Sequence, residues 1–552
     1  MKRGILALLV AAALVGPRAA APCTNILVTK GASTDGSTLI TYAADSHEFY
    51  GELVLIPGGT FPPGTTREIL EWDSGKFLGR IPQAPRTWSV VGNMNERQVA
   101  IGETTFGGRD SLKDPAGVLD YGSLMFIALE RAATAREAIK VITDLVAEHG
   151  YASTGESISI SDPNEAWIFE IIGKGPGRKG AVWVARRIPD DYISAHANYP
   201  RIRQFPLNDP ANCLYARDVI SFAREKGWFT GRDEEFSFAD TYHPLKVGPL
   251  RSCEGRVWNV FRRAAPSLGL TPDYVDGSTL KKRLPLWIKP DRKLSVQDAM
   301  ALMRDHFEGT PFDMNEDIGG GPFAMPYRWR PMGYEIDSVK YVHERAISTQ
   351  QTGFSFVAQS RSALPDPIGG VLWFGVDDTY MTVYVPFYCG ITRAPHSWAA
   401  GTADFDAFSR ESAFWVFNFV ANWAYTRYSD MIVDIQDVQR ELEGRFVAEQ
   451  PAIDLAARKL YEQAPQLARD YLTDYCGRQG EMVTERWRRL GDFLFWKYLD
   501  GNVRDDQGKV THPPYRERWL RAIVRDAGDR VKQGRPDAPP KAASPPVGAT
   551  GR

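Results

Sequence analysis

The sequence has no large excess of either charge and, beyond its N-terminus, no long hydrophobic run. The 66 basic and 68 acidic side chains give a formal net charge of −2. This balance argues against a protein that holds nucleic acid through a general positive charge. The best candidate for a membrane span, residues 412–425, is short and is interrupted by Asn418 and Asn422. We therefore expect no membrane span in the body of the chain.

The first 22 residues have the layout of a secretory signal peptide. Lys2 and Arg3 precede an apolar run at residues 5–15, and the small residues 19–21 follow it. A basic start, a short apolar core and small residues before the cleavage point are typical of such a signal. We predict that residues 1–22 are a signal peptide or short propeptide and that the protein is secreted or periplasmic. An N-terminal anchor that stays in place is the alternative.

Cysteine is scarce as well, and the number of cysteines is odd. In an exported protein an odd number leaves one thiol without a disulfide partner, and the position of Cys23 at the predicted cleavage point makes it that thiol. The other four could form two disulfides, in any of three pairings, or remain buried free thiols. The five cysteines are Cys23, Cys213, Cys253, Cys389 and Cys476.

The segment that begins at Cys23 is predicted to fold back on itself. Residues 23–30 and 38–43 are strand-like, and the turn residues between them include Asp35-Gly36, a pair typical of hairpins. A hairpin folded near residue 34 returns Asp45 to the neighbourhood of Cys23.

Strand pairs and a few helices account for the rest of residues 23–400, which predicts an α+β fold or a layered αββα fold. Helices are expected at 134–149 and 295–308, because each begins with a capping Ser or Thr and is followed by Gly. Residues 401–530 are predicted to form a helical section and residues 531–552 a disordered tail. Strands are expected at 88–93, 98–105, 157–161, 166–172, 181–187, 192–197, 346–358, 370–375 and 381–388.

If processing makes Cys23 the first residue, that residue carries both a thiol and a free α-amine. The amine has a pKa of about 8, so it can accept the thiol proton and activate sulfur for attack on a carbonyl. A carboxylate must then orient the amine, and Asp45 is placed for this. A lipidated or disulfide-bonded cysteine is the commoner outcome after a signal peptide, but Pro22 disfavours lipidation. Pro22 also requires a second processing step, for which self-cleavage is the expected route.

A series of short motifs runs in order over roughly residues 23 to 395. The motifs are CTN at 23–25, KGAS-x-DGS at 30–37, DS at 45–46, GNMNE at 92–96, GETT at 102–105, GES at 155–157, SDP at 161–163, AHAN at 195–198, RI at 201–202, RVW at 256–258, QSR at 359–361, GGVLW at 369–373 and YVPFY at 384–388. On these motifs the sequence resembles the dipeptidase A-like cysteine peptidases of the N-terminal nucleophile (Ntn) hydrolase superfamily.

The resemblance implies a four-layer αββα Ntn-hydrolase sandwich that hydrolyses short peptides, mainly dipeptides, with Cys23 as nucleophile. It implies that Asp45 orients the amino terminus and that Asn198 donates to the oxyanion. The backbone amide near Thr105 would be the second donor, and Arg256 would be the basic residue near the thiol. No metal and no organic cofactor is implied.

One position departs from the family pattern. Many relatives carry Arg two or three residues before the motif Asp, whereas this chain has Tyr42 there, which leaves substrate preference open. Two other functions also remain open: the same mechanism on bile-salt, penicillin or acyl-lactone amides, or an inactive secreted binding protein on a hydrolase scaffold. The expected partners are small peptide substrates and not nucleic acid, and the oligomeric state is not predicted.

Overall fold

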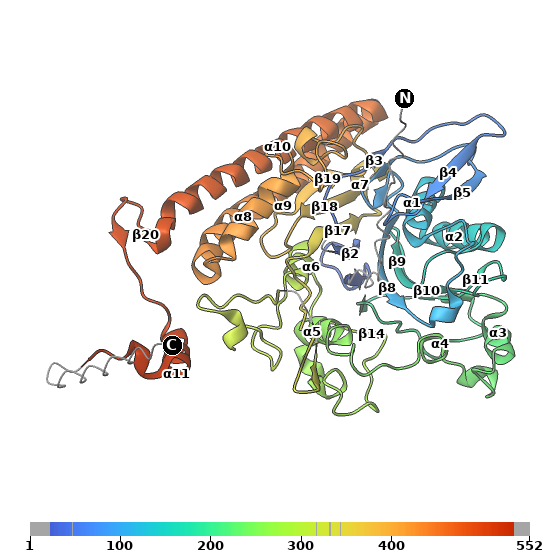
Figure 1. Ribbon diagram of the computed structural model, residues 1–552. Helices are drawn as coiled ribbons and strands as arrows, with labels where there is room; N and C mark the ends of the chain where they lie inside the picture. The colour runs from blue at the N-terminus through green and yellow to red at the C-terminus, as the bar shows by residue number, and fades with distance from the viewer. Residues whose placement is uncertain (1–22, 47, 316, 330–332, 343, 535–552) are drawn as a thin grey trace, which may run out of the picture.

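The computed structural model describes residues 23–46, 48–315, 317–329, 333–342 and 344–534. These residues form two large β-sheets with helices on both sides of them, followed by a long helical section (Figure 1). This mixture of helices and strands confirms the predicted α+β class. The predicted signal peptide and residues 535–552 of the predicted tail lie outside the described residues.

The first sheet has the N-terminal hairpin at its centre. Its strand order is β14-β12-β1-β2-β17-β18-β19, and neighbouring strands are antiparallel. Every residue of β2 is buried, so both faces of this central strand are covered. The strands are β1 (Asn25–Val28), β2 (Thr38–Asp45), β12 (Ile193–His196), β14 (Trp287–Ile288), β17 (Thr352–Ser360), β18 (Gly370–Val376) and β19 (Val385–Tyr388).

The second sheet has the order β13-β11-β10-β9-β8-β7-β6-β3. Alternate side chains of β10 point to opposite faces: Trp167 and Phe169 join one hydrophobic core, and Ile168 and Ile172 join the other. The sheet is therefore buried on both faces. Its strands are β3 (Leu55–Ile56), β6 (Val90–Val91), β7 (Met94–Asn95), β8 (Ala100–Gly107), β9 (Gly155–Ser161), β10 (Ala166–Gly173), β11 (Ala181–Arg187) and β13 (Cys213–Tyr215).

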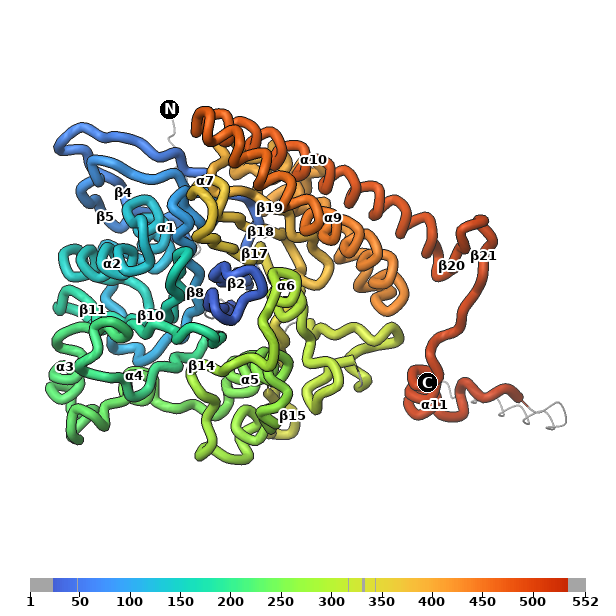
Figure 2. Tube along the Cα trace, turned by 180° about the vertical axis from the view of Figure 1, so that it is seen from behind, coloured from blue at the N-terminus to red at the C-terminus, as the bar shows by residue number. Residues whose placement is uncertain are grey.

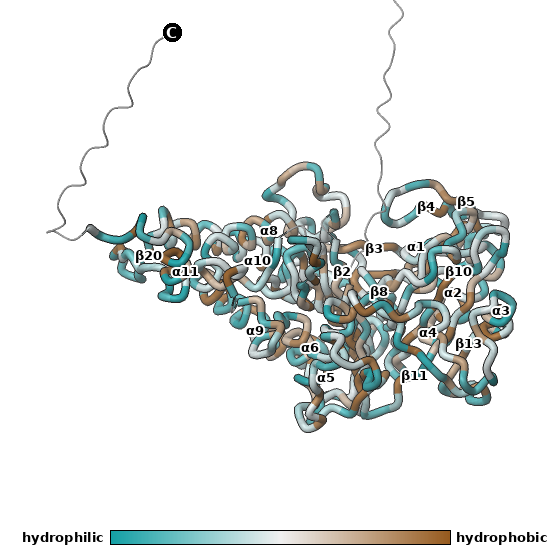
Figure 3. Tube along the Cα trace, turned by 60° about the horizontal axis from the view of Figure 1, so that its bottom comes forward, coloured by the Kyte–Doolittle hydropathy of each residue, from teal (hydrophilic) through white to brown (hydrophobic). Residues whose placement is uncertain are grey.

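The two sheets pack face to face, because β2 of the first sheet lies against β8 and β9 of the second. Helices α1 (Tyr121–Arg131) and α2 (Ala135–His149) cover the other face of the second sheet (Figure 1). On the first sheet, α5 (Glu254–Ala264) packs on β12 and α6 (Val296–Met303) on β2 and β17. Hydrophobic segments run through the region of β2, β3 and β8 in Figure 3. Shorter elements are α3 (Val219–Glu225), α4 (Phe238–Tyr242), α7 (Asp366–Gly369) and the hairpins β4 (Thr66–Leu70) with β5 (Phe77–Pro82) and β15 (Tyr334–Ile336) with β16 (Val339–Tyr341).

The predicted N-terminal hairpin is confirmed. Leu27 pairs with Ile40, and Thr24 bridges to Ala43 closer to the start of the chain. In the connecting turn, the Asp35 carboxylate accepts hydrogen bonds from the backbone and the hydroxyl of Ser37 (3.1 and 2.6 Å). These side-chain hydrogen bonds stabilise the turn, which is too long to be held by strand-to-strand backbone hydrogen bonds alone.

One predicted helix is confirmed and another is too long. Helix α2 begins after Thr134, whose side chain accepts from the Glu137 amide, and ends before Gly150, which has a φ of 83°. Helix α6 has the expected Ser295 cap but ends at Met303, not at residue 308. The backbone leaves the helical range at Arg304 (φ −91°, ψ 11°), and Phe307, with a φ of 65°, cannot belong to a helix. Between the predicted strands 88–93 and 98–105 lies one further short strand, β7.

Helices fill most of residues 413–497. They are α8 (Ala413–Ala424), α9 (Tyr428–Gln463) and α10 (Pro465–Lys497). Helix α10 runs beside α9 and contacts β19, and the Phe417 ring of α8 stacks on Trp487 of α10 with centroids 4.6 Å apart. Beyond α10 lie the hairpin of β20 (Val503–Arg504) and β21 (Val510–Thr511) and helix α11 (Glu517–Ala527), far from the sheets (Figure 2).

Two further findings concern the sequence predictions. Within the described ranges, no helix has both the length and the apolar character that a bilayer span requires. The thiols of Cys213, Cys253, Cys389 and Cys476 are buried and form no disulfide, so of the two alternatives for these four the structure has the unpaired one.

Candidate active site

Cys23 lies just before β1 and is completely buried. Its Sγ is 3.6 Å from Oε1 of Glu103 in β8 and 3.8 Å from the hydroxyl of Tyr42 in β2. The thiol therefore sits where the two sheets face each other. In the full-length chain its own backbone nitrogen is part of a peptide bond.

Burial raises the pKa of the Cys23 thiol well above its usual value, and the carboxylates of Glu103 and Asp45 raise it further. Hydrogen bonds with the Asp45 backbone and with the Tyr42 side chain lower this pKa, but they do not reverse the shift. The thiol of the unprocessed chain is therefore neutral at physiological pH. It needs a base before it can act as a nucleophile.

Asp45 ends β2 and is brought beside Cys23, as the hairpin argument predicts. Its side chain is fully buried and accepts from the Thr352 hydroxyl at 2.6 Å and from the Arg345 guanidinium. Burial raises the pKa of Asp45, and Arg345 is the largest influence that lowers it. The carboxylate is thus held in one place by partners from a distant part of the chain.

Arg345 is one of the residues at this site that the sequence analysis missed. It is buried, and burial together with the nearby Arg256 lowers its pKa to about 9, while Asp45 and Cys23 oppose that shift. Arg345 thus places a cation near Asp45 and Cys23 although Tyr42 occupies the position where relatives often have Arg. No local motif marked it, because its partner Asp45 is 300 residues away.

Arg256 reaches the backbone carbonyl of Cys23. From α5, its Nη1 donates to the Cys23 carbonyl oxygen (2.6 Å) and to Oγ1 of Thr24 (2.7 Å). Its Nη2 donates to Oδ1 of Asn198 at 2.8 Å. Arg256 therefore ties the first residues of the proposed mature chain to Asn198.

Asn198 and Thr105 come together on the other side of Arg256. Because Oδ1 of Asn198 accepts from Arg256, its Nδ2 faces Thr105 and donates to that residue's carbonyl oxygen at 2.8 Å. Asn198 has a φ of 56°, a left-handed conformation that Asn tolerates better than most residues. The amide orientation is thus fixed, with Oδ1 toward Arg256 and Nδ2 toward Thr105.

Two buried glutamates lie next to the thiol. Oε1 of Glu103 accepts from the Tyr42 hydroxyl at 2.7 Å, and the carboxyl of Glu156, on the neighbouring strand β9, is in hydrogen-bonding reach of Glu103. Burial raises the pKa of Glu103 to about 7 and the pKa of Glu156 well above its usual value. Both glutamates belong to the family-like segments at 102–105 and 155–157, but the sequence analysis gave them no role.

His196 has a structural place between the sheets. Its Nδ1 and Nε2 are each 2.8 Å from a hydroxyl, of Thr104 and Ser159 respectively. Burial lowers its pKa to about 3, so the ring is neutral. In the described part of the chain, no group of three or more His, Cys, Asp or Glu side chains is arranged to hold a metal ion.

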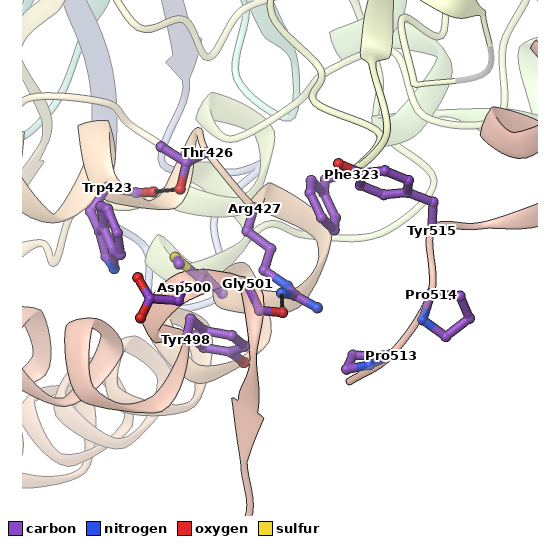
Figure 4. Close-up of a pocket in the computed structure, with 11 residues that line it drawn as sticks. Phe323, Trp423, Thr426, Arg427, Tyr498, Asp500, Gly501, Pro513, Pro514 and Tyr515 are labelled. Atoms are coloured by element: carbon purple, nitrogen blue, oxygen red, sulfur yellow. Dashed lines mark hydrogen bonds between the residues drawn. The ribbon is translucent and has the colours of Figure 1, made fainter. Parts of the chain in front are cut away.

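A small aromatic cavity of about 70 Å³ adjoins the Tyr42 ring. Phe354 packs edge-on against Tyr42, with centroids 5.7 Å apart, and Trp72 stacks on Phe126 across the cavity wall. A larger cavity of about 570 Å³ lies near α8, α9 and β20, lined by Trp423, Arg427 and Tyr498 among others (Figure 4). None of the predicted site residues lines this larger cavity.

Comparison with known proteins identifies similar sequences over most of the chain. Residues 54–441 match the model of "Peptidase family C69", a range that includes Thr105, Asn198 and Arg256 and begins after Cys23 and Asp45. A "Probable dipeptidase" of Latilactobacillus sakei is 27% identical over 391 residues, which are 66% of this chain and 74% of that protein. "Dipeptidase A" of Lactobacillus helveticus is 26% identical over 451 residues, 77% of this chain and 84% of that protein.

Proposed function

The chain belongs to peptidase family C69, and from this premise we propose that it is an exported dipeptidase whose nucleophile is Cys23, unmasked by removal of residues 1–22. The names of the two relatives support the substrate class, since both are called dipeptidases. The observation that carries the mechanism is the fixed position of Asp45 beside Cys23, held there by Arg345 and Thr352.

Processing changes the chemistry of Cys23 in this proposal. Cleavage after Pro22 turns the amide nitrogen of Cys23 into an amine with a pKa of about 8. Asp45 orients this amine, which takes the thiol proton. The raised thiol pKa is then offset by a base on the same residue and by the ammonium charge that the transfer creates.

The reaction proceeds by acyl transfer to sulfur. The thiolate attacks the peptide carbonyl, and the resulting oxyanion receives hydrogen bonds from Nδ2 of Asn198 and from the backbone amide near Thr105. The Cys23 ammonium returns its proton to the leaving amine as the C–N bond breaks, which leaves a thioester. Water, deprotonated by the same amine, hydrolyses the thioester and frees the acid. Arg256 is a positioning residue, because it holds the Asn198 amide and the Cys23 carbonyl in place.

The fold supports this assignment. Two face-to-face sheets with helices on their outer faces agree with the αββα sandwich of Ntn hydrolases, and Cys23 stands just before a central strand of one sheet. Export and self-cleavage are proposed from the pattern of residues 1–22 and from Pro22. The catalytic unit is proposed to span residues 23–400, with the helical section 401–530 packed against it.

The test is hydrolysis by the exported wild type and by Cys23→Ala. We expect wild type to cleave unmodified dipeptides faster than N-acylated ones, and Cys23→Ala to retain its fold and lose hydrolysis. Preference for bile-salt, penicillin or acyl-lactone amides would show an acylase instead. Full activity in Cys23→Ala would refute the nucleophile, and an inert wild type would indicate a binding protein.

A further inference from the structure

Glu103 and Glu156 form a buried acidic pair without a cationic partner among the described residues. Both residues are 1% exposed, and no Lys, Arg or His of the described part forms an ion pair with either of them. The oxygen Oε2 of each has no ordinary donor, although the two carboxyl groups are within reach of one shared proton. A buried carboxylate is costly unless a cation compensates it, so this pair is prepared to receive a positive charge.

The two arginines near Cys23 have partners other than the glutamate pair. Arg345 pairs with Asp45, and Arg256 binds the Cys23 carbonyl and Asn198. Oε1 of Glu103 accepts from two neutral groups, the Tyr42 hydroxyl at 2.7 Å and the Cys23 thiol at 3.6 Å. The arginines of the site thus lie on the Asp45 side of Cys23, and within the ranges that the structure describes the Glu103 side of Cys23 carries only acidic and neutral groups.

We propose that Glu103 binds the α-ammonium of the dipeptide substrate, that Glu156 positions Glu103, and that the cavity beside Tyr42 takes the substrate's first side chain. This inference rests on the proposed dipeptidase function and names its recognition chemistry. A dipeptide carries an ammonium two bonds from the carbonyl that is attacked. An N-acylated compound has no such charge.

The distances suit this arrangement. A carbonyl carbon ready for attack lies about 3–3.5 Å from sulfur, and Oε1 of Glu103 is 3.6 Å from the same sulfur. An ammonium bonded to the neighbouring carbon can therefore reach Oε1 at about 2.8 Å, the distance of a charge-assisted hydrogen bond. Two carboxyl groups that share one proton carry a single negative charge, and the ammonium neutralises this charge while Glu156 keeps the proton.

The adjoining cavity sets the size of the side chain. The Tyr42 hydroxyl bonds to Glu103, and the Tyr42 ring is part of the cavity wall together with Phe49, Trp72, Phe126 and Phe354. The cavity volume is about 70 Å³, whereas an apolar cavity of about 150 Å³ holds benzene. A small aliphatic side chain such as that of valine is therefore the preferred first residue.

The test compares two ligands that differ only in the ammonium. The substrate is Val-Ala, and the probe is 3-methylbutanoyl-alanine, which lacks the amine and is measured as a competitive inhibitor. The processed wild type, Glu103→Gln and the exposed control Glu234→Gln are assayed with both. Gln keeps the acceptor for Tyr42 and removes the charge, and iodoacetamide titration of Cys23 reports whether the site remains intact.

We expect Glu103→Gln to lower kcat/KM for Val-Ala about a hundredfold, mainly through KM, because a buried charge loses its partner. The inhibition constant of 3-methylbutanoyl-alanine should change less than about threefold, and Glu234→Gln should match wild type in both. Unchanged kcat/KM in Glu103→Gln, or an equal loss for substrate and probe, would overturn the proposal and leave the dipeptidase function standing. A wild type that hydrolyses acylated amides but no free dipeptide would refute both.

Discussion

Arg345 and Asp45 form a buried ion pair across 300 residues of sequence. The Arg345 side chain is 2% exposed and the Asp45 side chain 0%, and Thr352 donates to the same carboxylate. The pair joins the N-terminal hairpin to the segment before β17. It fixes the carboxylate that our mechanism requires beside Cys23.

Removing one member of this pair should be costly. Arg345→Met leaves Asp45 buried without its cation, so we expect a loss of about 3–5 kcal/mol in the free energy of unfolding. Asp45→Asn combined with Arg345→Met removes both charges and should recover much of this stability without restoring activity. Urea unfolding and kcat/KM on a dipeptide measure the two effects. Arg393→Met, in an exposed pair with Asp474, is the control and should cost less than about 1 kcal/mol.

Asn198→Ala tests the oxyanion site. Loss of one oxyanion donor lowers kcat by about a hundredfold to a thousandfold, with little change in KM because the interaction forms in the transition state. The exposed Asn208→Ala is the matched control and should behave as wild type. A large rise in KM with unchanged kcat would place Asn198 in substrate binding instead.

Glu103 should make stability depend on pH. Its pKa is about 7 in the folded protein and about 4.3 in the unfolded chain, so the folded state holds more protons between these values. Stability therefore falls as pH rises through this window, by about 3 kcal/mol for an independent group. In urea unfolding from about pH 4.5 to about pH 7.5, the stability of Glu103→Gln should fall less steeply than that of wild type.

The groups that face Glu103 can also contribute to the pH dependence of stability. They are Tyr42, Cys23, Glu156 and Asp73, and Glu156 shares a proton with Glu103. Cys23→Ala is therefore the background for all the unfolding curves, so that the thiol does not contribute. Parallel pH profiles in Glu103→Gln and its parent would contradict the raised pKa.

The packing of the helical section makes a separate prediction. Phe417 is 1% exposed and stacks on the buried Trp487, so Phe417→Ala should cost about 3–5 kcal/mol. Phe419, on the same helix, is 38% exposed and its replacement by Ala should cost less than about 1 kcal/mol. If calorimetry of Phe417→Ala shows a separate early transition while the sheets stay folded, the section is an independent domain.

Local chemistry made part of this structure predictable. The Asp35-Gly36 turn and the strands beside it placed Asp45 near Cys23, and the Thr134 cap with Gly150 bounded α2. Contacts between distant segments carried no comparable signal. Arg345 reaches Asp45, and Glu103 meets Glu156 and Cys23, only through pairings that the tertiary fold creates. Helix α6 was predicted too long because its backbone leaves the helical range at Arg304, well before the Gly309 that the sequence suggested as its stop.

The central claim is that Cys23 becomes the first residue of the active enzyme. N-terminal sequencing and intact mass of the exported, active protein test it directly. Our account predicts a mature chain that begins at Cys23 and loses all activity when one iodoacetamide group labels that residue. An active mature chain that begins at Pro22 or at any earlier residue would contradict it, because the α-amine and the thiol would then belong to different residues.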